Sequence, residues 1–264
     1  MKTIKRDLSR KLRKIEIDVL GDLHIGDPQC NFKEIKRRIK DIKENRNLYC
    51  ILNGDIINNG LKSSVSDIYE DTLSPKKQVD LAIELLEPIK HKILAITSGN
   101  HEYRTNKEVN LSPLGYIILS LGLKNVYLDE GGVLFLRLGE INGQIATNKN
   151  KLRQVLYTFY LTHGSGGGRT YGGKVNQLMQ LKSIIDTDIY IHSHTHLPIT
   201  LPGTRLKVDS RNNSVQESDT LFLNTSATLN YGGYGQRKKY EPLSQKNPII
   251  ILDGKKKHFG VKIL

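Results

Sequence analysis

The run IEIDVLGDLH, residues 15–24, decides the fold class because it joins a β-branched segment to a turn that carries an aspartate and a histidine. Its first part predicts a strand over residues 15–20, followed by a loop. Two later runs share this form: YCILN at 49–53 continues into Gly-Asp, and KILAITSGN at 92–100 ends in a glycine turn. Three predicted strands therefore each deliver polar residues just beyond their carboxyl ends.

Helical patterns separate these three strands. Residues 31–45 carry apolar side chains at helical spacing, with charged residues on the opposite face. Residues 74–89 start with a serine cap and a proline in the first turn, which is typical of a helix start. The order strand–helix–strand–helix–strand predicts parallel strands joined by crossover helices. Ligands of such sheets collect beyond the carboxyl ends of the strands.

The second half of the chain is richer in predicted β-structure. We expect strands at 133–138, 154–163, 188–192, 221–226, 248–253 and 258–264. A helix is expected at 173–185. Neither a low-complexity linker nor an internal repeat divides the chain. These features predict a single α/β domain over residues 1–264, with two sheets packed between helices and residues 201–264 completing the second sheet.

The composition bears on partners and compartment. Forty Lys and Arg residues against 27 Asp and Glu residues give a formal net charge of +13. This charge favours polyanionic partners such as nucleic acid, although Lys-rich surfaces also serve solubility alone. Cys30 and Cys50 are predicted to be free thiols in a reducing compartment, without a disulfide framework or zinc ribbon. We expect a cytoplasmic protein with no membrane partner, because the sequence has neither a signal-peptide core nor a bilayer-spanning apolar run. The oligomeric state stays open.

Five short polar motifs carry the chemistry, and each follows a predicted strand. In chain order they are Asp22-Leu23-His24, Gly54-Asp55, Gly99-Asn100-His101-Glu102, His163-Gly164 and His194-Thr195-His196. Each motif alone could be a turn or a helix cap. Together, and in this order, they resemble the calcineurin-like metallophosphoesterases, whose pattern is D-x-H, G-D, G-N-H-[DE], a lone His and G-H-x-H. The resemblance covers about residues 15–200 and departs from the pattern where Ser193 replaces the last glycine.

The resemblance implies a four-layer sandwich of two mixed β-sheets flanked by helices, and a site for two divalent metal ions. One metal would take Asp22, His24, Asp55 and His196. The other would take Asp55, Asn100, His163 and His194, so that Asp55 bridges the pair. Nitrogen and oxygen ligands without thiolate fit Mn²⁺, Fe or Zn²⁺ and argue against an all-oxygen Ca²⁺ site. Mn²⁺ is our first choice, and Ni²⁺ is a further alternative. Two such ions can polarise a phosphoryl oxygen and activate water.

Two histidines need separate assignment. Within the family pattern, His101 faces the phosphate and stabilises charge or protonates the leaving oxygen; the alternative is a histidine that only hydrogen-bonds the loop backbone. His192, His194 and His196 alternate as in a strand, which suggests a three-histidine zinc site. The strand is, however, expected to end near His192, so that His194 and His196 leave a loop toward different metals. His192 is then a buried neighbour.

Two loops combine glycine with aromatic and basic residues: GSGGGRTYGGK at 164–174 and NYGGYGQRKKY at 230–240. They could follow a phosphate backbone and stack on bases, or they could be ordinary surface loops. We expect Arg104, Arg169 and Tyr171 to contact substrate, and we favour a phosphodiesterase acting on nucleic acid, similar to the family's DNA-repair nucleases. The alternatives are a small-molecule or nucleotide phosphodiesterase, a phosphomonoesterase including a protein phosphatase, and a metal-free binding scaffold.

Overall fold

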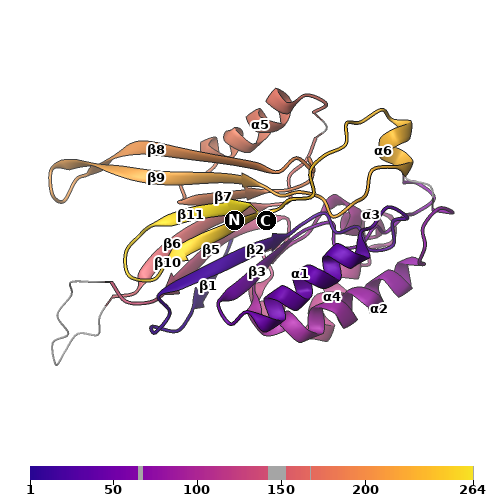
Figure 1. The fold of residues 1–264 in the computed structure, drawn as a ribbon, viewed down its shortest axis with the longest axis horizontal. Helices are drawn as coiled ribbons and strands as arrows, with labels where there is room; N and C mark the ends of the chain where they lie inside the picture. Colours follow the sequence, from indigo (N-terminus) through magenta and orange to yellow (C-terminus); the bar gives the residue numbers. More distant parts are fainter. Residues whose placement is uncertain (65–67, 142–152, 167, 264) are drawn as a thin grey trace.

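Two stacked β-sheets lie at the centre of the computed structural model, which describes residues 1–64, 68–141, 153–166 and 168–263 (Figure 1). The first sheet has five strands in the order β11-β10-β2-β3-β4. Their bounds are Phe259–Ile263, Pro248–Asp253, Lys14–Leu20, Leu48–Asn53 and Ile93–Thr97. Strands β2, β3 and β4 are parallel, as the sequence predicts, and β10 is antiparallel to β2.

The second sheet has six strands in the order β1-β5-β6-β7-β9-β8. Their bounds are Lys2–Asp7, Gly131–Leu138, Val155–Thr162, Ile189–His192, Ser214–Asn224 and Ile199–Asp209. Strands β6, β7 and β9 are parallel, whereas β5 is antiparallel to β6 and β8 is antiparallel to β9. Buried apolar side chains of both sheets, such as Ile17, Leu134 and Phe159, form one core between them.

Helices cover the outer faces of the two sheets (Figure 1). Helices α1 (Phe32–Glu44), α2 (Pro75–Leu86) and α4 (Pro113–Leu121) pack on the five-stranded sheet through a second apolar core. Helix α5 (Tyr171–Gln180) packs on the six-stranded sheet. Short 3₁₀ turns lie at Glu87–Lys92, Lys124–Val126 and Leu181–Ser183. This arrangement of layers confirms the predicted α/β sandwich of two mixed sheets flanked by helices.

Several elements have no clear pattern in the sequence. β1 is a basic edge strand, and Ile4 is its one apolar residue that packs on a core. Helix α3 (Asn100–Val109) buries Glu102 and has no apolar stripe. Helix α6 (Gly233–Arg237) buries none of its residues. These elements are absent from the sequence-based assignment, since periodic burial is the signal on which that assignment depends. β8 and α4 are absent from it too, although α4 follows a serine cap and buries apolar residues at helical spacing: Leu114, Ile117, Ile118 and Leu121.

The C-terminal residues depart from the prediction in one respect. Residues 201–264 do not all complete the second sheet, because β10 and β11 extend the five-stranded sheet beside β2. An unpaired edge of β2 would leave buried backbone N–H and C=O groups without partners, and β10 supplies those partners. The strand expected at 258–264 spans Phe259–Ile263, and Leu264 lies outside the described residues.

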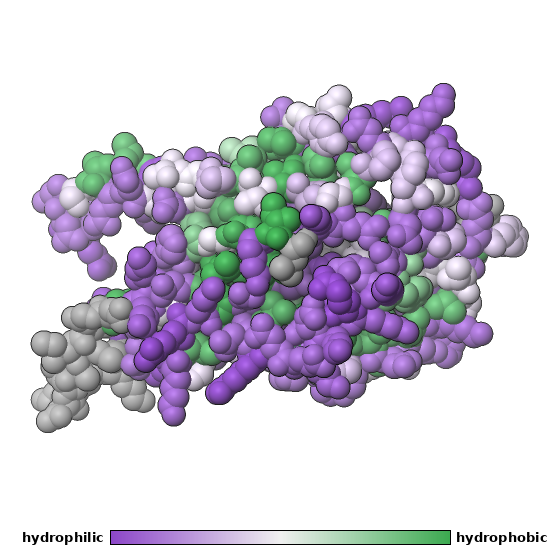
Figure 2. Space-filling model, viewed as in Figure 1, coloured by the Kyte–Doolittle hydropathy of each residue, from purple (hydrophilic) through white to green (hydrophobic). Residues whose placement is uncertain are grey.

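The β8–β9 hairpin projects beyond the rest of its sheet, because β7 pairs with β9 only from Leu221 to Asn224 (Figure 1). The outer part of this hairpin exposes Leu206, Val208 and Val215. Most of the surface in Figure 2 is hydrophilic. Over the described ranges, no helix combines the length and the apolar character needed to cross a bilayer.

Candidate metal centre

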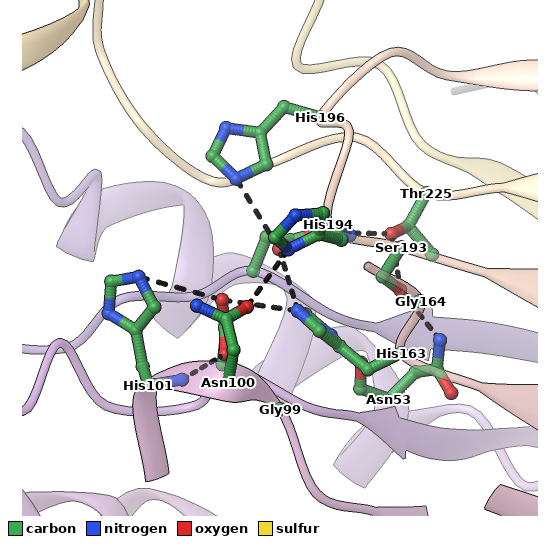
Figure 3. Close-up of polar contacts among 12 residues, drawn as sticks. Asn53, Gly99, Asn100, His101, His163, Gly164, Ser193, His194, His196 and Thr225 are labelled. Carbon is green, nitrogen blue, oxygen red and sulfur yellow. Dashed lines mark hydrogen bonds and ion pairs between the residues drawn. The ribbon is translucent and has the colours of Figure 1, made fainter. Parts of the chain in front are cut away.

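The five polar motifs meet at one edge of the sandwich, beyond the carboxyl ends of five strands. Asp22 and His24 follow β2, and Asp55 follows β3. Asn100 and His101 open α3 after β4, His163 follows β6, and His194 and His196 follow β7. Parallel pairing within each sheet brings these ends together, so the predicted ligands converge although they span 175 residues of chain (Figure 3).

Potential ligand atoms form two clusters that share the site. In one cluster, ligand atoms of Asp22, His24 and His196 all lie within 4.8 Å of one another. In the other, those of Asp55, His163 and His194 do so. Each cluster contains three of the four ligands that the family resemblance implies for one metal ion. His24 and Asp55 also group with His101, which joins the two clusters.

Asn100 completes the second cluster. Its side-chain oxygen Oδ1 lies 2.9 Å from Nδ1 of His194 (Figure 3). This contact turns the amide oxygen of Asn100 toward the same point as the imidazole of His194. All seven predicted ligands therefore lie around one site, and their role as ligands is part of the function proposed below.

The potential ligand atoms do not satisfy one another by hydrogen bonding, and a bound cation would satisfy them better. Asp22 Oδ1 and His163 Nε2 are buried and have no hydrogen-bond partner within the part of the chain that the structure describes. The Nε2 atoms of His24 and His196 face each other at 3.4 Å, and Nε2 of His163 lies 3.1 Å from Asp55 Oδ2 without hydrogen-bond geometry. Buried polar atoms without partners are rare in proteins, and a divalent cation would satisfy these.

The backbone of the site adopts an uncommon conformation. Five of the predicted ligands have positive φ angles: Asp22 (50°), His24 (46°), Asp55 (51°), His194 (62°) and His196 (59°). Left-handed backbone in non-glycine residues costs about 1–3 kcal/mol each and persists only where the surroundings enforce it. Backbone hydrogen bonds supply that enforcement here, from Asp22 N to Gly54 O and from His24 N to Asp55 O.

The electrostatic setting favours positive charge between the clusters. Burial alone would raise the pKa of Asp22, but the adjacent His196 and His163 lower it to about 2. Burial alone would lower the pKa of His163, but Asp55 and Asp22 raise it to about 10. The two carboxylates thus stay ionised within the protein and attract a proton to His163. The same negative charge would attract a divalent cation.

Glycine is required at two neighbouring turns, the one after β3 that carries Asp55 and the one after β4 that carries Asn100. Gly54 has φ +78°, and a Cβ there would lie 2.5 Å from Nδ1 of His163 and 2.7 Å from the Cα of Gly99. A Cβ on Gly99 would lie 2.1 Å from Asp55 Oδ1. The backbones of the β3 and β4 loops can therefore approach each other only without side chains, and this approach places Asp55 at the centre.

Glu102 has a role that the sequence patterns alone do not show. Its buried carboxylate accepts hydrogen bonds from the backbone N–H groups of Asp55, Ile56, Ile57 and Gly99, at 2.6–3.2 Å. Burial and the nearby Asp55 raise the pKa of Glu102 to about 7. Glu102 thus ties the loop that carries Asp55 to the start of α3. Its place in the Gly-Asn-His-Glu motif was the available signal.

His101 lies at the rim of the clusters, beside an arginine. Its Nδ1 lies 2.6 Å from the carbonyl oxygen of Asn58, so Nδ1 donates and Nε2 accepts. The guanidinium of Arg104 donates to that Nε2 at 2.9 Å. Nε2 also lies 3.7 Å from Asp55 Oδ2. His101 therefore contacts the loop backbone and also faces the site (Figure 3).

His192 is separate from the clusters. Strand β7 ends at this residue, and its Nδ1 lies 2.7 Å from Asn224 Oδ1 in the buried interior. The ring packs so tightly on Gly164 that a Cβ there would lie 2.0 Å from Nε2. His192 belongs to none of the potential ligand groups found among the described residues.

The structure brings the two glycine-rich loops together. Arg169 and Tyr171 are exposed, after His163 and at the start of α5. The guanidinium carbon of Arg169 lies 5.6 Å from the ring centroid of Tyr240, so the loops 164–174 and 230–240 meet. Tyr240 also lies beside Tyr234, with ring centroids 6.2 Å apart. Gly167 of the first loop lies outside the described residues.

The fold and the donor set define a class: an α/β sandwich whose Asp, His and Asn side chains could hold divalent metal ions. The sequence model of the calcineurin-like phosphoesterases matches residues 15–198, and the chain belongs to this family. The chain is thus a phosphoesterase of a family of metal-dependent hydrolases. Among curated proteins, none matches this sequence.

Similar solved structures are distant. A conserved uncharacterised protein of Streptococcus pneumoniae TIGR4, described as a predicted phosphoesterase, is 15% identical with a TM-score of 0.39, over 96% of this chain and 90% of its own. Vps29 of Entamoeba histolytica complexed with Zn²⁺ is 12% identical with a TM-score of 0.41, over 95% and 97%. Nuclease MPE of Pseudomonas putida is 13% identical with a TM-score of 0.35, over 93% and 86%.

Proposed function

We propose that the chain is a two-metal phosphodiesterase that acts on nucleic acid. The observation that carries this proposal is the position of the two loops that leave the ligand cluster. Residues 164–174 begin directly after His163, and the segment before residues 230–240 contacts Asp22, because Thr228 N donates to the carbonyl oxygen of Asp22. A substrate phosphate between the clusters would therefore have basic and aromatic side chains within reach on both loops.

The ligand assignment follows the clusters. Asp22, His24, Asp55 and His196 would hold one metal, and Asp55, Asn100, His163 and His194 would hold the other, with Asp55 shared. When bound, two divalent cations lower the pKa of water and polarise a phosphoryl oxygen. The mixture of imidazole, carboxylate and amide ligands favours Mn²⁺, and Fe, Zn²⁺ or Ni²⁺ would also fit.

His101 and Arg104 would act on the phosphate itself. The hydrogen bond between them holds the imidazole and the guanidinium side by side at the rim of the site. Arg104 would neutralise a phosphoryl oxygen, and His101 would stabilise charge on the leaving oxygen or protonate it. Because Nε2 of His101 accepts in this contact, Arg104 is the donor toward a bound diester, and His101 would donate only as an imidazolium whose Nε2–H has turned from Arg104 to the phosphate.

The exposed loop residues would bind the rest of the nucleic acid. Tyr171, Tyr234 and Tyr240 are each at least 36% exposed, and Arg169 lies over the ring of Tyr240. Aromatic faces that stack on bases contribute about 1–3 kcal/mol per base in single-stranded complexes. The net charge of +13 would add electrostatic attraction to phosphates. We assign the protein to the cytoplasm, because both cysteines are free thiols.

A small phosphoester is the second candidate substrate, because acidic side chains occupy part of the same surface. Arg237 makes a two-point ion pair with Glu70 at 2.8 and 2.9 Å, which lowers its availability for phosphate. The nearby carboxylate of Glu241 raises the pKa of the Tyr171 phenol. These carboxylates would repel a long phosphate backbone more than they would repel a nucleotide held at the metals.

A comparative assay with added Mn²⁺ tests the proposal. The substrates are bis-p-nitrophenyl phosphate, p-nitrophenyl phosphate, and single- and double-stranded DNA. We expect the diester and DNA to be cleaved, and expect EDTA to abolish cleavage in a way that Mn²⁺ reverses. If the monoester turns over far faster than every diester, the nucleic-acid proposal is wrong. If no phosphoester is cleaved and no divalent metal binds, the enzyme proposal itself is wrong.

A further inference from the structure

Ser193 occupies the position where the family pattern has glycine, and its hydroxyl lies inside a buried hydrogen-bond chain. Asn53, Ser193, Thr225 and Asp22 are all fully buried. The Nδ2 atom of Asn53 donates to Ser193 Oγ at 2.7 Å (Figure 3). Ser193 Oγ lies 2.8 Å from Thr225 Oγ1, which lies 3.4 Å from Asp22 Oδ2. The chain thus runs from the end of β3 to a predicted metal ligand.

The direction of this chain is set by what each group can donate. The amide nitrogen of Asn53 can only donate, and the carboxylate of Asp22 can only accept. Each hydroxyl between them has one hydrogen. The arrangement that satisfies every group therefore has Asn53 donating to Ser193, Ser193 donating to Thr225, and Thr225 donating to Asp22. Ser193 therefore accepts a hydrogen bond from Asn53 of the five-stranded sheet and donates one to Thr225, which follows β9 of the six-stranded sheet.

This chain of hydrogen bonds determines which carboxylate oxygen of Asp22 faces the site. Oδ2 receives Thr225 Oγ1 and also the backbone N–H of His194 at 3.0 Å. Oδ1 has no hydrogen-bond partner among the described residues and lies 3.4 Å from Nε2 of His196. Two donors on one oxygen prevent rotation of the carboxylate, so that Oδ1 stays directed at the cluster.

Neighbouring residues leave room for this hydroxyl and little more. A Cβ on Gly21 would lie 2.5 Å from Ser193 Oγ, so the glycine before Asp22 makes space for the serine. The remaining polar atoms of Asn53 are also occupied, because Oδ1 accepts from Thr97 Oγ1 at 2.8 Å and its carbonyl oxygen lies 2.7 Å from His163 Nδ1. Asn53 therefore contacts the surroundings of both clusters.

We propose that Ser193 is a positioning residue that orients Asp22 for its metal, a task for which a glycine has no side chain. This inference rests on the metal site proposed above. Hydrogen-bond partners of metal ligands fix ligand orientation, and their loss typically weakens metal binding about 10- to 100-fold. The effect of Ser193 falls on the cluster of Asp22, His24 and His196, because Asp22 is the ligand at the end of the chain.

The test measures metal binding to Ser193→Ala, Thr225→Val and the double variant. Mn²⁺ titration by calorimetry gives the affinities, and the visible absorption of Co²⁺ reports ligand geometry. We expect Ser193→Ala to weaken one of two binding steps about 10-fold or more and to alter one Co²⁺ spectrum. The double variant should bind no more weakly than about the weaker single variant, because both changes break the same chain.

Thr195→Val is the matched control. It removes a buried hydroxyl from the same loop, and that hydroxyl has no hydrogen-bond partner in the described part of the chain. This control should keep both binding steps and both spectra, while thermal unfolding of the metal-free proteins reports any loss of stability. Wild-type affinity and spectrum in Ser193→Ala would overturn the positioning role. Failure of the wild-type protein to bind Mn²⁺ or Co²⁺ would instead overturn the proposed metal site.

Discussion

Asp55 is the residue on which the two ligand clusters depend. Its carboxylate lies 3.1 Å from Nε2 of His163 and 4.0 Å from Nε2 of His24, and it is buried. Asp55→Asn keeps the shape and removes the charge that would offset repulsion between two cations. We expect turnover to fall below detection and bound Mn²⁺ to fall for both sites, as measured by rate assays and elemental analysis. Wild-type rates in this variant would refute the bridging role.

Exposed Asp41 offers a control for the Asp55 variant. Asp41 accepts a hydrogen bond from Arg37 on the surface of α1, and it belongs to none of the potential ligand groups found among the described residues. Asp41→Asn makes the same chemical change without removing a predicted ligand. Its rate and metal content should equal those of the wild-type protein.

His101 is expected to affect chemistry without affecting metal binding. His101→Asn should keep the Mn²⁺ content of the wild-type protein, because the imidazole is not part of the proposed ligand sets. Turnover of bis-p-nitrophenyl phosphate should fall by about 10²-fold or more, the scale of a lost acid–base group. Elemental analysis and steady-state rates on the same preparation check both parts. A variant that loses its metal would show that His101 is a ligand rather than a contact of the phosphate.

At the scale of single elements, a buried ion pair fastens α1 to β2. Arg38 donates to both carboxylate oxygens of Asp18 at 2.6 and 3.0 Å, and both residues are at most 4% exposed. Arg38 also donates to Thr228 Oγ1 and to the carbonyl oxygen of Val19. Since Thr228 N in turn donates to the carbonyl oxygen of Asp22, the pair supports the loop behind the ligand cluster.

Removal of Arg38 should therefore be costly. Arg38→Met would leave the carboxylate of Asp18 buried without its ion-pair partner, which typically lowers the free energy of unfolding by about 3–5 kcal/mol. Neighbouring Arg37 provides the control, because its pairs with Glu34 and Asp41 lie on the surface. Arg37→Met should cost less than about 1 kcal/mol. Urea unfolding of both variants measures the difference, and equal losses would contradict this role for the buried pair.

At the scale of the whole molecule, the two loops make one surface because β6 and β9, the strands that precede them, lie on either side of β7 in the six-stranded sheet. Tyr240→Ala removes the ring that lies beside Arg169 and Tyr234. We expect single-stranded DNA to bind about 5- to 150-fold more weakly, the equivalent of about 1–3 kcal/mol for one stacked base. Anisotropy with metal-free protein gives the affinity without cleavage. Hydrolysis of bis-p-nitrophenyl phosphate should not change.

Tyr116 is a suitable control for the Tyr240 variant. It is 60% exposed on α4, which packs on the five-stranded sheet, and it is outside both loops. Tyr116→Ala should bind DNA like the wild-type protein. The logarithm of the wild-type affinity should also fall linearly with the logarithm of salt concentration, as it does when phosphates are neutralised. If the affinity for DNA changes neither with Tyr240→Ala nor with salt concentration, the small-phosphoester alternative is favoured.

Local patterns were sufficient to predict the strands β2, β3 and β4, their parallel pairing and the polar residues at their ends. A strand shows as an alternating or continuous run of apolar residues within a short segment, so it can be recognised from the sequence alone. The family membership and the sandwich of two mixed sheets were predicted from the five motifs and are confirmed. The pairing of β10 with β2 was not predictable, because its partner lies more than 200 residues away in the chain.

The sequence by itself determined the types and order of the candidate ligands, since turns after buried strands need particular residues at particular positions. Only the tertiary structure decided how those residues meet. Asp22 Oδ1 faces the cluster because Thr225 and His194 bind the other oxygen, and the loop of Asp55 is held by Glu102. Such contacts join residues that are distant in the chain. Their geometry is set by sheet stacking and buried hydrogen bonding, which no local pattern encodes.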